Sequence, residues 1–207
     1  MSYLTSNPQL KPFGKPTTHW MVDVETTGLN PAVHAITSIA LLQFQPGEII
    51  ENFDLHEKVH VRIIDKEWPN EDVSTMHWRK GMGIDEAEAL LPGWLKQPLR
   101  EYIATKVCAD PLHTYLWSKS PQFDISFLYY FLYYSSSPLG KLGVPWSYKN
   151  IVDVRTLTTC AHFTEKDYEW AEIEADNCHG KTEVYKKHTA LYDCVCQVMQ
   201  VAKVYGI

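Results

Sequence analysis

His19-Trp20-Met21-Val22-Asp23-Val24-Glu25-Thr26-Thr27-Gly28 decides the fold, because this stretch joins an apolar β-strand pattern to two carboxylates at its end. Side chains at positions i and i+2 of a strand point to the same face, so Asp23 and Glu25 should lie side by side. Their like charges repel unless a cation lies between them, and oxygen ligands favour a hard divalent metal. A strand that merely ends at a solvated surface would explain the same pattern without a metal.

The composition predicts one globular unit. A chain of 207 residues with 45% hydrophobic and 13% aromatic residues can bury a sizeable core. We expect an irregular, proline-containing arm at residues 1–17, followed by a single domain at 18–207. The net charge of −6 lowers the expectation of passive nucleic-acid binding. It does not exclude a metal-dependent enzyme acting on nucleic acid, because clustered carboxylates supply such acidity and bound metals reverse its sign locally.

The cysteines and the apolar runs indicate an intracellular protein. The five cysteines lack the paired spacing of a structural zinc site, although Cys160 with His162, or Cys178 with His179, remains a weak metal-ligand alternative. No signal peptide or membrane-length apolar run is evident, so no membrane partner is expected. The expected location is the cytosol, of a bacterial cell or of an infected host.

The order of apolar periods and turn residues predicts an α/β fold with a mixed sheet. An antiparallel meander should come first, from the acidic strand through strands at 35–44 and 49–61. Later strands alternate with helices, which favours parallel pairing and helices on both faces. The later strands are expected at 112–117 and 146–152, and the helices at 72–79, 85–91, 93–106, 123–134, after Asp153, and at 190–204. The acidic run 164–176 is interpreted as a solvated surface segment.

Three further residues with acid–base or metal-ligating side chains follow at wide spacing. Asp124 stands at the start of an apolar helix, where it could serve only as a favourable N-terminal charge. His188 and Asp193 are five positions apart and cannot share one helical face. This spacing predicts His188 in a loop and Asp193 in the first turns of the next helix. Taken singly, a histidine beside Lys186 and Lys187 is better explained as an exposed loop residue.

Taken in order, these motifs resemble those of the DEDDh group of 3′–5′ exonucleases, which have a ribonuclease H-like fold. The match runs through Val22-Asp23-Val24-Glu25-Thr26-Thr27-Gly28, Phe123-Asp124 and His188-Thr189-Ala190-Leu191-Tyr192-Asp193. Within the group the chain most resembles phage exonuclease A-type and bacterial exoribonuclease-like proteins. That closer likeness rests on Ser74-Thr75-Met76-His77-Trp78, Trp117, Asp153-x-Arg155-Thr156 and Asp193-Cys194. The chain departs from its relatives at 119–123, where they often carry Gly or Asn.

The resemblance implies metal-dependent hydrolysis at the 3′ end of single-stranded DNA or RNA, with release of nucleoside 5′-monophosphates. It implies that Asp23 bridges two Mg²⁺ or Mn²⁺ ions. Glu25 and Asp193 would complete one ion site and Asp124 would hold the second ion. His188 would be the general base, since imidazole titrates near neutrality. Two ions can stabilise both the attacking and the leaving oxygen of a phosphodiester.

The remaining expectations concern the substrate. Thr26, Thr27 and Gly28 should grip the 3′-terminal sugar, and Trp78, Phe123 and Trp117 could stack on bases, although burial in the core explains Trp117 and Phe123 better. Lys181, Lys186 and Lys187 would neutralise phosphates or lie in a solvated loop. Asp153 and Arg155 are expected to form an internal ion pair that supports the site.

A binding or scaffold module that keeps the fold without catalysis is the alternative. The intact carboxylates and His188 argue against it, because gathered negative charge hinders phosphate binding. The choice between DNA and RNA stays open at this point, as does the oligomeric state, a homodimer included.

Overall fold

The computed structural model describes residues 17–49, 58–62, 71–90, 99–133, 146–179 and 186–206. Three strands come first and the later strands are separated by helices, as the sequence predicts. The strands are β1 (Thr18–Thr26), β2 (Ile36–Phe44), β3 (Lys58–Arg62), β4 (Thr114–Ser118) and β5 (Ile151–Asp153). The helices are α1 (Val73–Met82), α2 (Ile84–Leu90), α3 (Leu99–Tyr102), α4 (Pro121–Tyr133), α5 (Val154–Cys160), α6 (Glu165–His179) and α7 (Ala190–Val204). A π-helical turn (Ile103–Val107) follows α3, and a 3₁₀ turn (Tyr148–Asn150) precedes β5.

The strands form one mixed sheet in the order β3-β2-β1-β4-β5. The pairs β1–β2 and β2–β3 are antiparallel, whereas β1–β4 and β4–β5 are parallel. The predicted antiparallel meander followed by parallel strands is therefore confirmed, and β1 lies at the centre of the sheet. The central position explains the long apolar run of β1, because a central strand covered on both faces buries successive side chains.

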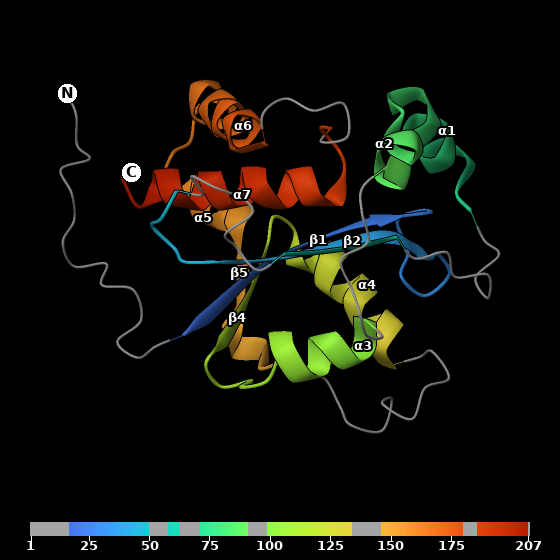
Figure 1. The fold of residues 1–207 in the computed structure, drawn as a ribbon, viewed down its shortest axis with the longest axis horizontal. Helices are drawn as coiled ribbons and strands as arrows, with labels where there is room; N and C mark the ends of the chain where they lie inside the picture. Colours follow the sequence, from blue (N-terminus) through green and yellow to red (C-terminus); the bar gives the residue numbers. More distant parts are fainter. Residues whose placement is uncertain are drawn as a thin grey trace.

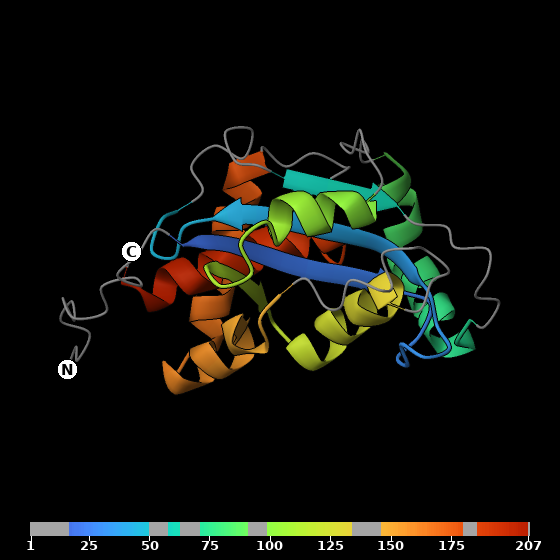
Figure 2. The same ribbon diagram turned by 90° about the horizontal axis from the view of Figure 1, so that it is seen from below.

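Helices cover both faces of the sheet (Figures 1 and 2), and the alternation of β1 assigns its side chains to two cores. Trp20, Val22 and Val24 pack with residues of α3 and α4 on one face. Met21 packs with residues of α7 on the other face. Asp23 and Glu25 continue the Met21 face, so two carboxylates stand where the pattern would place two more core residues.

The helix α7 is the main cover of the Met21 face. Its residues Leu191, Val195, Val198 and Val201 are fully buried in that core. Thr189 caps its N-terminus by accepting a hydrogen bond from the main-chain N–H of Tyr192, as N-cap residues do. No helix in the described part of the chain is long and apolar enough to cross a membrane.

Several sequence predictions need correction or lie partly outside the described ranges. The acidic run 164–176 is not merely a surface segment: it forms α6, whose Ala171 and Ala175 are buried against α7. The buried face of α6 consists of a few small residues among many charged ones. Such a face gives only a weak hydrophobic periodicity, so the sequence does not predict this helix. The expected strand at 146–152 shrinks to β5, because the 3₁₀ turn occupies residues 148–150. The predicted arm falls outside the described residues up to position 16, as do parts of the third strand and of the helix at 93–106.

Candidate active site

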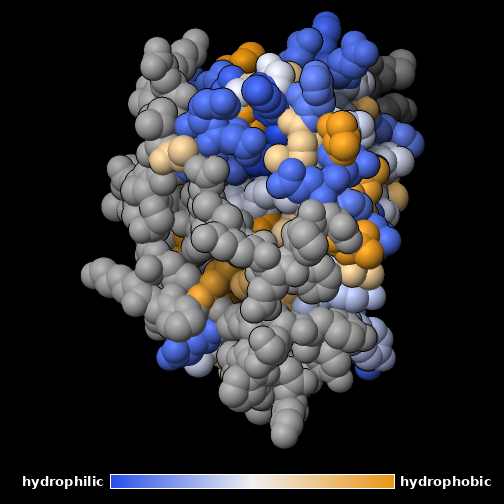
Figure 3. Space-filling model, turned by 90° about the vertical axis from the view of Figure 1, so that its right-hand side faces the viewer, coloured by the Kyte–Doolittle hydropathy of each residue, from blue (hydrophilic) through white to orange (hydrophobic). Residues whose placement is uncertain are grey.

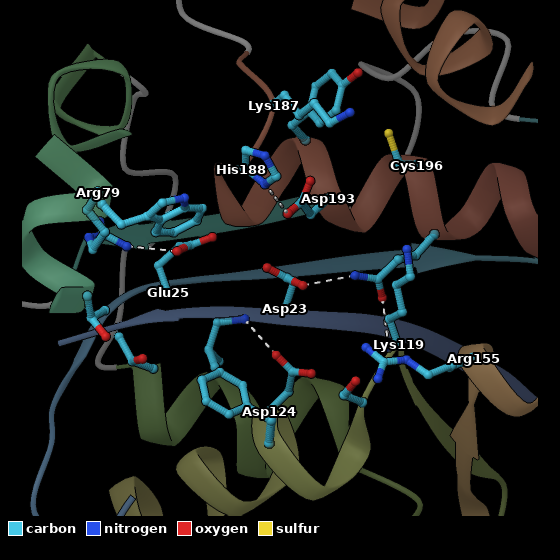
Figure 4. A pocket seen from close by; sticks show the side chains of 18 of the residues that line it. Asp23, Glu25, Arg79, Lys119, Asp124, Arg155, Lys187, His188, Asp193 and Cys196 are labelled. Atoms are coloured by element: carbon cyan, nitrogen blue, oxygen red, sulfur yellow. Dashed lines mark hydrogen bonds and ion pairs between the residues drawn. The ribbon is translucent and has the colours of Figure 1, made fainter. Parts of the chain in front are cut away.

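The end of β1 brings together the carboxylates of three predicted site residues. One oxygen each from Asp23, Glu25 and Asp193 lies within 4.8 Å of the other two. Asp23 and Glu25 share a face of β1, and Asp193 reaches them from the first turn of α7. Figure 4 shows the three side chains pointing toward a common space between the strand and the helix. An all-carboxylate set of oxygen ligands fits a hard divalent cation such as Mg²⁺ or Mn²⁺.

His188 lies in the loop before α7, as its spacing from Asp193 predicts. Its Nδ1 is 4.0 Å from Oδ2 of Asp193, and its ring meets the edge of Trp78 with centroids 5.4 Å apart. The backbone of His188 is left-handed, at φ 69°. Non-glycine residues seldom adopt this conformation, and its cost is often found at functional sites. The turn is held by a hydrogen bond from the main-chain N–H of Thr189 to the carbonyl of Lys186.

Asp124 approaches the site from α4, on the opposite side of β1 from Asp193 (Figure 4). One of its oxygens accepts a hydrogen bond from the main-chain N–H of Val24 at 3.1 Å, and the other accepts from the Ser118 hydroxyl. Asp124 is 5% exposed, so it is not simply a solvated charge at a helix N-terminus. The structure thus places all four predicted carboxylates around the end of β1, although Asp124 stands outside the group of three.

The clustered acids carry raised pKa values. Burial is the main cause of the raised pKa of Asp23, and the charges of Asp124 and Asp193 add to it. Burial also raises the pKa of Glu25, against the opposing charge of Arg79. The pKa of Asp124 rises to about 6, mainly through burial. Asp193 is raised by burial and partly relieved by His188. Such a set binds protons or cations more readily than isolated carboxylates do.

Arg79, which belongs to none of the sequence motifs, joins the site to α1 and α2. Its guanidinium is fully buried and forms ion pairs with Glu25 at 2.7 Å, Asp85 at 2.6 Å and Glu88 at 3.1 Å. Glu88 is itself buried and accepts a hydrogen bond from Ser38 of β2. The only sequence signal was an arginine beside Trp78 in an otherwise amphipathic helix. Nothing in that pattern shows that the side chain turns inward.

Gln197 is the second functional side chain that sequence reasoning missed. It stands one turn after Asp193 on α7 and is 3% exposed. Its amide donates to Oδ1 of Asp23 at 2.9 Å, while its carbonyl oxygen accepts from the main-chain N–H of Lys119 at 3.0 Å. A buried glutamine four positions after a helical acid was the available signal, since such residues share a face.

These residues line a cleft of about 1050 Å³. Hydrophilic side chains gather in the upper part of the molecular face seen in Figure 3, which is the right-hand side of Figure 1. The cleft also contains Leu29 and Trp78, which are 75% and 48% exposed. Trp78 therefore belongs to the cleft wall and not to the core.

Only some of the other residues predicted to contact the substrate line the cleft. Thr26 and Phe123 line the cleft, and Phe123 also packs against Phe127 with ring centroids 4.9 Å apart. The Thr27 hydroxyl accepts from the main-chain N–H of Ala35. A Cβ on Gly28 would lie 2.6 Å from the ring of His34, so this turn requires glycine for close approach. Neither Thr27 nor Gly28 is among the described residues that line the cleft.

Trp117 is buried in the core and does not line the cleft, as predicted in preference to stacking on bases. Its indole N–H donates to Nδ1 of His19 at 3.0 Å.

The predicted ion pair between Asp153 and Arg155 is not formed. Asp153 is the N-cap of α5, and its carboxylate accepts from the Arg155 main-chain N–H and the Thr156 hydroxyl. In an Asp-x-x-Thr motif at a helix start, the hydrogen-bonding capacity of the carboxylate is filled by nearby groups, so this carboxylate does not pair with the Arg155 guanidinium. The Arg155 side chain instead lines the cleft. Lys187 also lines it but is paired with Glu172 at 2.6 Å, and Lys181 lies outside the described residues.

The mixed sheet, the acidic group at the end of β1 and the match to a family model together support a 3′–5′ exonuclease of the DEDDh type. The chain belongs to the 3′–5′ exoribonuclease Rv2179c-like domain family, whose model matches residues 18–205. No curated protein matches the chain significantly. Membership of this exonuclease family argues against the scaffold alternative and implies dependence on divalent metal.

Solved exonucleases share the fold. The zinc-bound form of an Escherichia coli exonuclease I complex with single-stranded DNA matches with a TM-score of 0.56 and 14% identity, over 91% of this chain and 40% of that one. Exonuclease I from Methylocaldum szegediense matches with a TM-score of 0.53 and 16% identity, over 91% and 40% of the two chains. The present chain therefore spans less than half the length of these structures.

Proposed function

We propose that this chain removes nucleoside 5′-monophosphates from the 3′ end of single-stranded nucleic acid, with RNA as the preferred substrate. The observation that carries the proposal is the convergence of Asp23, Glu25 and Asp193 within 4.8 Å, beside His188, in an open cleft. The preference for RNA rests on the description of the family as exoribonucleases.

The carboxylates hold and orient the reacting groups. Asp23, Glu25 and Asp193 would bind one divalent ion, and Asp23 with Asp124 a second. Such ions, when bound, lower the pKa of water and neutralise charge on the phosphate. Gln197 fixes Oδ1 of Asp23, and Arg79 fixes Oε2 of Glu25. These contacts restrain the rotation of both carboxylates in the cleft.

His188 acts as the general base. Its left-handed backbone in the loop before α7 presents the ring to the acidic group, and 33% of its side chain is exposed. The imidazole takes a proton from the attacking water as the new P–O bond forms and the bond to the leaving 3′ oxygen breaks. The leaving oxygen regains a proton from solvent, which leaves a strand shortened by one nucleotide and a free nucleoside 5′-monophosphate.

The decisive experiment compares end-labelled strands. Matched RNA and DNA oligonucleotides carrying a 5′ label should both be tested with Mg²⁺ and with Mn²⁺. We expect a ladder that shortens from the 3′ end, with faster loss of RNA. A 3′ label should be released at once as the mononucleotide. Internal cleavage products, or intact strands with either metal, would refute the proposal, whereas faster loss of DNA would overturn only the preference for RNA.

A further inference from the structure

The two ends of the cleft differ in charge. At one end Arg79 is matched by three carboxylates, and the exposed neighbours Leu29 and Trp78 are apolar. Lys119 and Arg155 stand at the other end, with the acids between them and Arg79 (Figure 4). Neither Lys119 nor Arg155 forms an ion pair with another described residue, although the molecule as a whole is acidic. Two cleft-lining cations that have no ion-pair partner among the described residues point to an anionic ligand group.

Lys119 is held in place from two directions. Its Nζ lies over the ring of Tyr168, 5.2 Å from the centroid. Tyr168 is fixed in turn by a hydrogen bond from its hydroxyl to Oγ1 of Thr158 at 3.1 Å and by an edge contact with Phe163. A cation stacked on an aromatic ring keeps its charge and its outward-facing hydrogens for another partner.

The main chain of Lys119 is also tied to the acidic group. Its N–H donates to Gln197 at 3.0 Å, and Gln197 donates to Asp23 at 2.9 Å. This chain of two hydrogen bonds fixes the cationic end of the cleft relative to the carboxylate that meets the scissile phosphate. These hydrogen bonds therefore set the position of the Lys119 main chain relative to Asp23.

We propose that Lys119 and Arg155, with Tyr168 beneath Lys119, form a subsite for the phosphate next to the scissile one. This inference rests on the proposed function, because it assumes that the scissile phosphate lies at Asp23. The uncharged sugar and base of the 3′-terminal nucleoside then lie at the Leu29 and Trp78 end. The rest of the strand leaves the cleft past Lys119 and Arg155, where its next negative charge meets two cations.

The test neutralises the phosphate and the lysine separately and together. One strand carries an uncharged methylphosphonate at the phosphate next to the scissile bond, and a control strand carries it several nucleotides further toward the 5′ end. Binding is measured by fluorescence anisotropy in a His188→Ala background with Mg²⁺, and kcat and KM are measured with His188 intact. The protein variants are Lys119→Met, Lys119→Arg and Arg155→Met.

Lys149→Met is the matched control, because Nζ of Lys149 also lies over a tyrosine, 5.8 Å from the ring centroid of Tyr148, but outside the cleft. We expect the neighbouring methylphosphonate to weaken binding about tenfold in the control, as the loss of one charge-assisted contact does. In Lys119→Met the same strand should lose less than about twofold. The slope of log affinity against log salt should also fall by about 0.7, and Lys119→Arg should restore both effects.

The outcomes separate this subsite from the proposed function. The subsite is overturned if the methylphosphonate next to the scissile bond weakens binding by the full factor in both Lys119→Met and Arg155→Met. It is also overturned if this methylphosphonate does not weaken binding to the control protein Lys149→Met although that protein still shortens the strand. An effect on kcat without an effect on KM would also overturn it, because a binding contact one nucleotide away should change KM. If the unmodified strand is not shortened at all, it is the proposed function that fails.

Discussion

At the scale of single residues, His188 is the site residue whose role is easiest to isolate. Its imidazole is outside the group of three carboxylates, so His188→Ala should leave metal binding largely intact. We expect kcat to fall by about 100- to 10,000-fold, the range for loss of a general base. Calorimetric titration with Mn²⁺ and single-turnover cleavage of a labelled strand measure the two quantities.

A matched control exists for His188. His162 also has a left-handed backbone, at φ 56°, and also precedes a helix, but it is exposed outside the cleft. His162→Ala should keep full activity. A His188→Ala variant that turns over at the rate of His162→Ala would refute the assignment of the base.

A second prediction at this scale concerns His19 and the pH dependence of the free energy of unfolding. Burial lowers its pKa to about 4 from 6.5, and its Nδ1 accepts the indole N–H of Trp117, which a protonated ring cannot do. The contribution of neutral His19 is therefore present above pH 6.5 and is lost as the pH falls toward 4. Between pH 7 and pH 5 the loss should be about 2 kcal/mol, at 1.36 kcal/mol per pH unit below 6.5.

Urea unfolding of the wild type and of His19→Gln at pH 7 and pH 5 measures this loss. Glutamine offers an acceptor and a donor without titrating, so the variant should lack the 2 kcal/mol decrease, while the carboxylates contribute equally to both proteins. Parallel pH dependence in the two proteins would contradict the prediction.

At the scale of elements, the sequence predicted best those segments whose side chains follow one strong period. The strand β1, the helix α7 and the loop position of His188 all come from such periods or from fixed motif spacing. The helix α6 was missed because its buried face consists of Ala171 and Ala175 within an acidic run. Arg79 and Gln197 were missed because their partners, Glu25 and Asp23, lie far away in the chain. Local patterns carry no information on such pairings.

Arg79 supports the largest stability prediction at this scale, since it joins α1 and α2 to β1. Arg79→Met would leave Glu88 buried without its cation, and we expect a loss of about 3–5 kcal/mol in the free energy of unfolding. Arg79→Lys should recover only part, because an ammonium cannot reproduce the planar guanidinium that meets three carboxylates. Chemical denaturation of the metal-free protein gives the values.

Asp85→Asn is the control for Arg79, because its side chain is 33% exposed and its pair with Arg79 is partly solvated. It should cost about 1 kcal/mol or less. The double variant Arg79→Met with Glu88→Gln should be more stable than Arg79→Met alone. Equal costs for Arg79→Met and Asp85→Asn would show that the buried charges are not coupled as the structure indicates.

At the scale of the whole molecule, the acidic site opposes folding when it is fully ionised, and divalent ions should reverse this effect. A carboxylate with a raised pKa contributes stability below its unfolded pKa near 4 and loses it as the pH rises through its folded pKa, which is about 6 for Asp124. Through Asp124 the metal-free protein should therefore lose stability between about pH 4 and pH 6, and through Asp23 and Glu25, whose pKa values are also raised, it should lose further stability as these groups ionise. Divalent cations bind the ionised carboxylates, so their stabilisation should grow over the same interval.

Thermal unfolding with Mg²⁺ or Mn²⁺ tests this prediction at pH 5.5 and pH 8. At a concentration of 100 times the dissociation constant, an ion adds about 2.7 kcal/mol, which is roughly 5–10 °C in Tm for a domain of this size. We expect that increase at pH 8 and a much smaller one at pH 5.5, where protons compete for the same oxygens. Asp23→Asn should reduce the response at both pH values, and NaCl at equal ionic strength should not reproduce it. An equal rise at both pH values would mean that the ions act elsewhere than at these carboxylates.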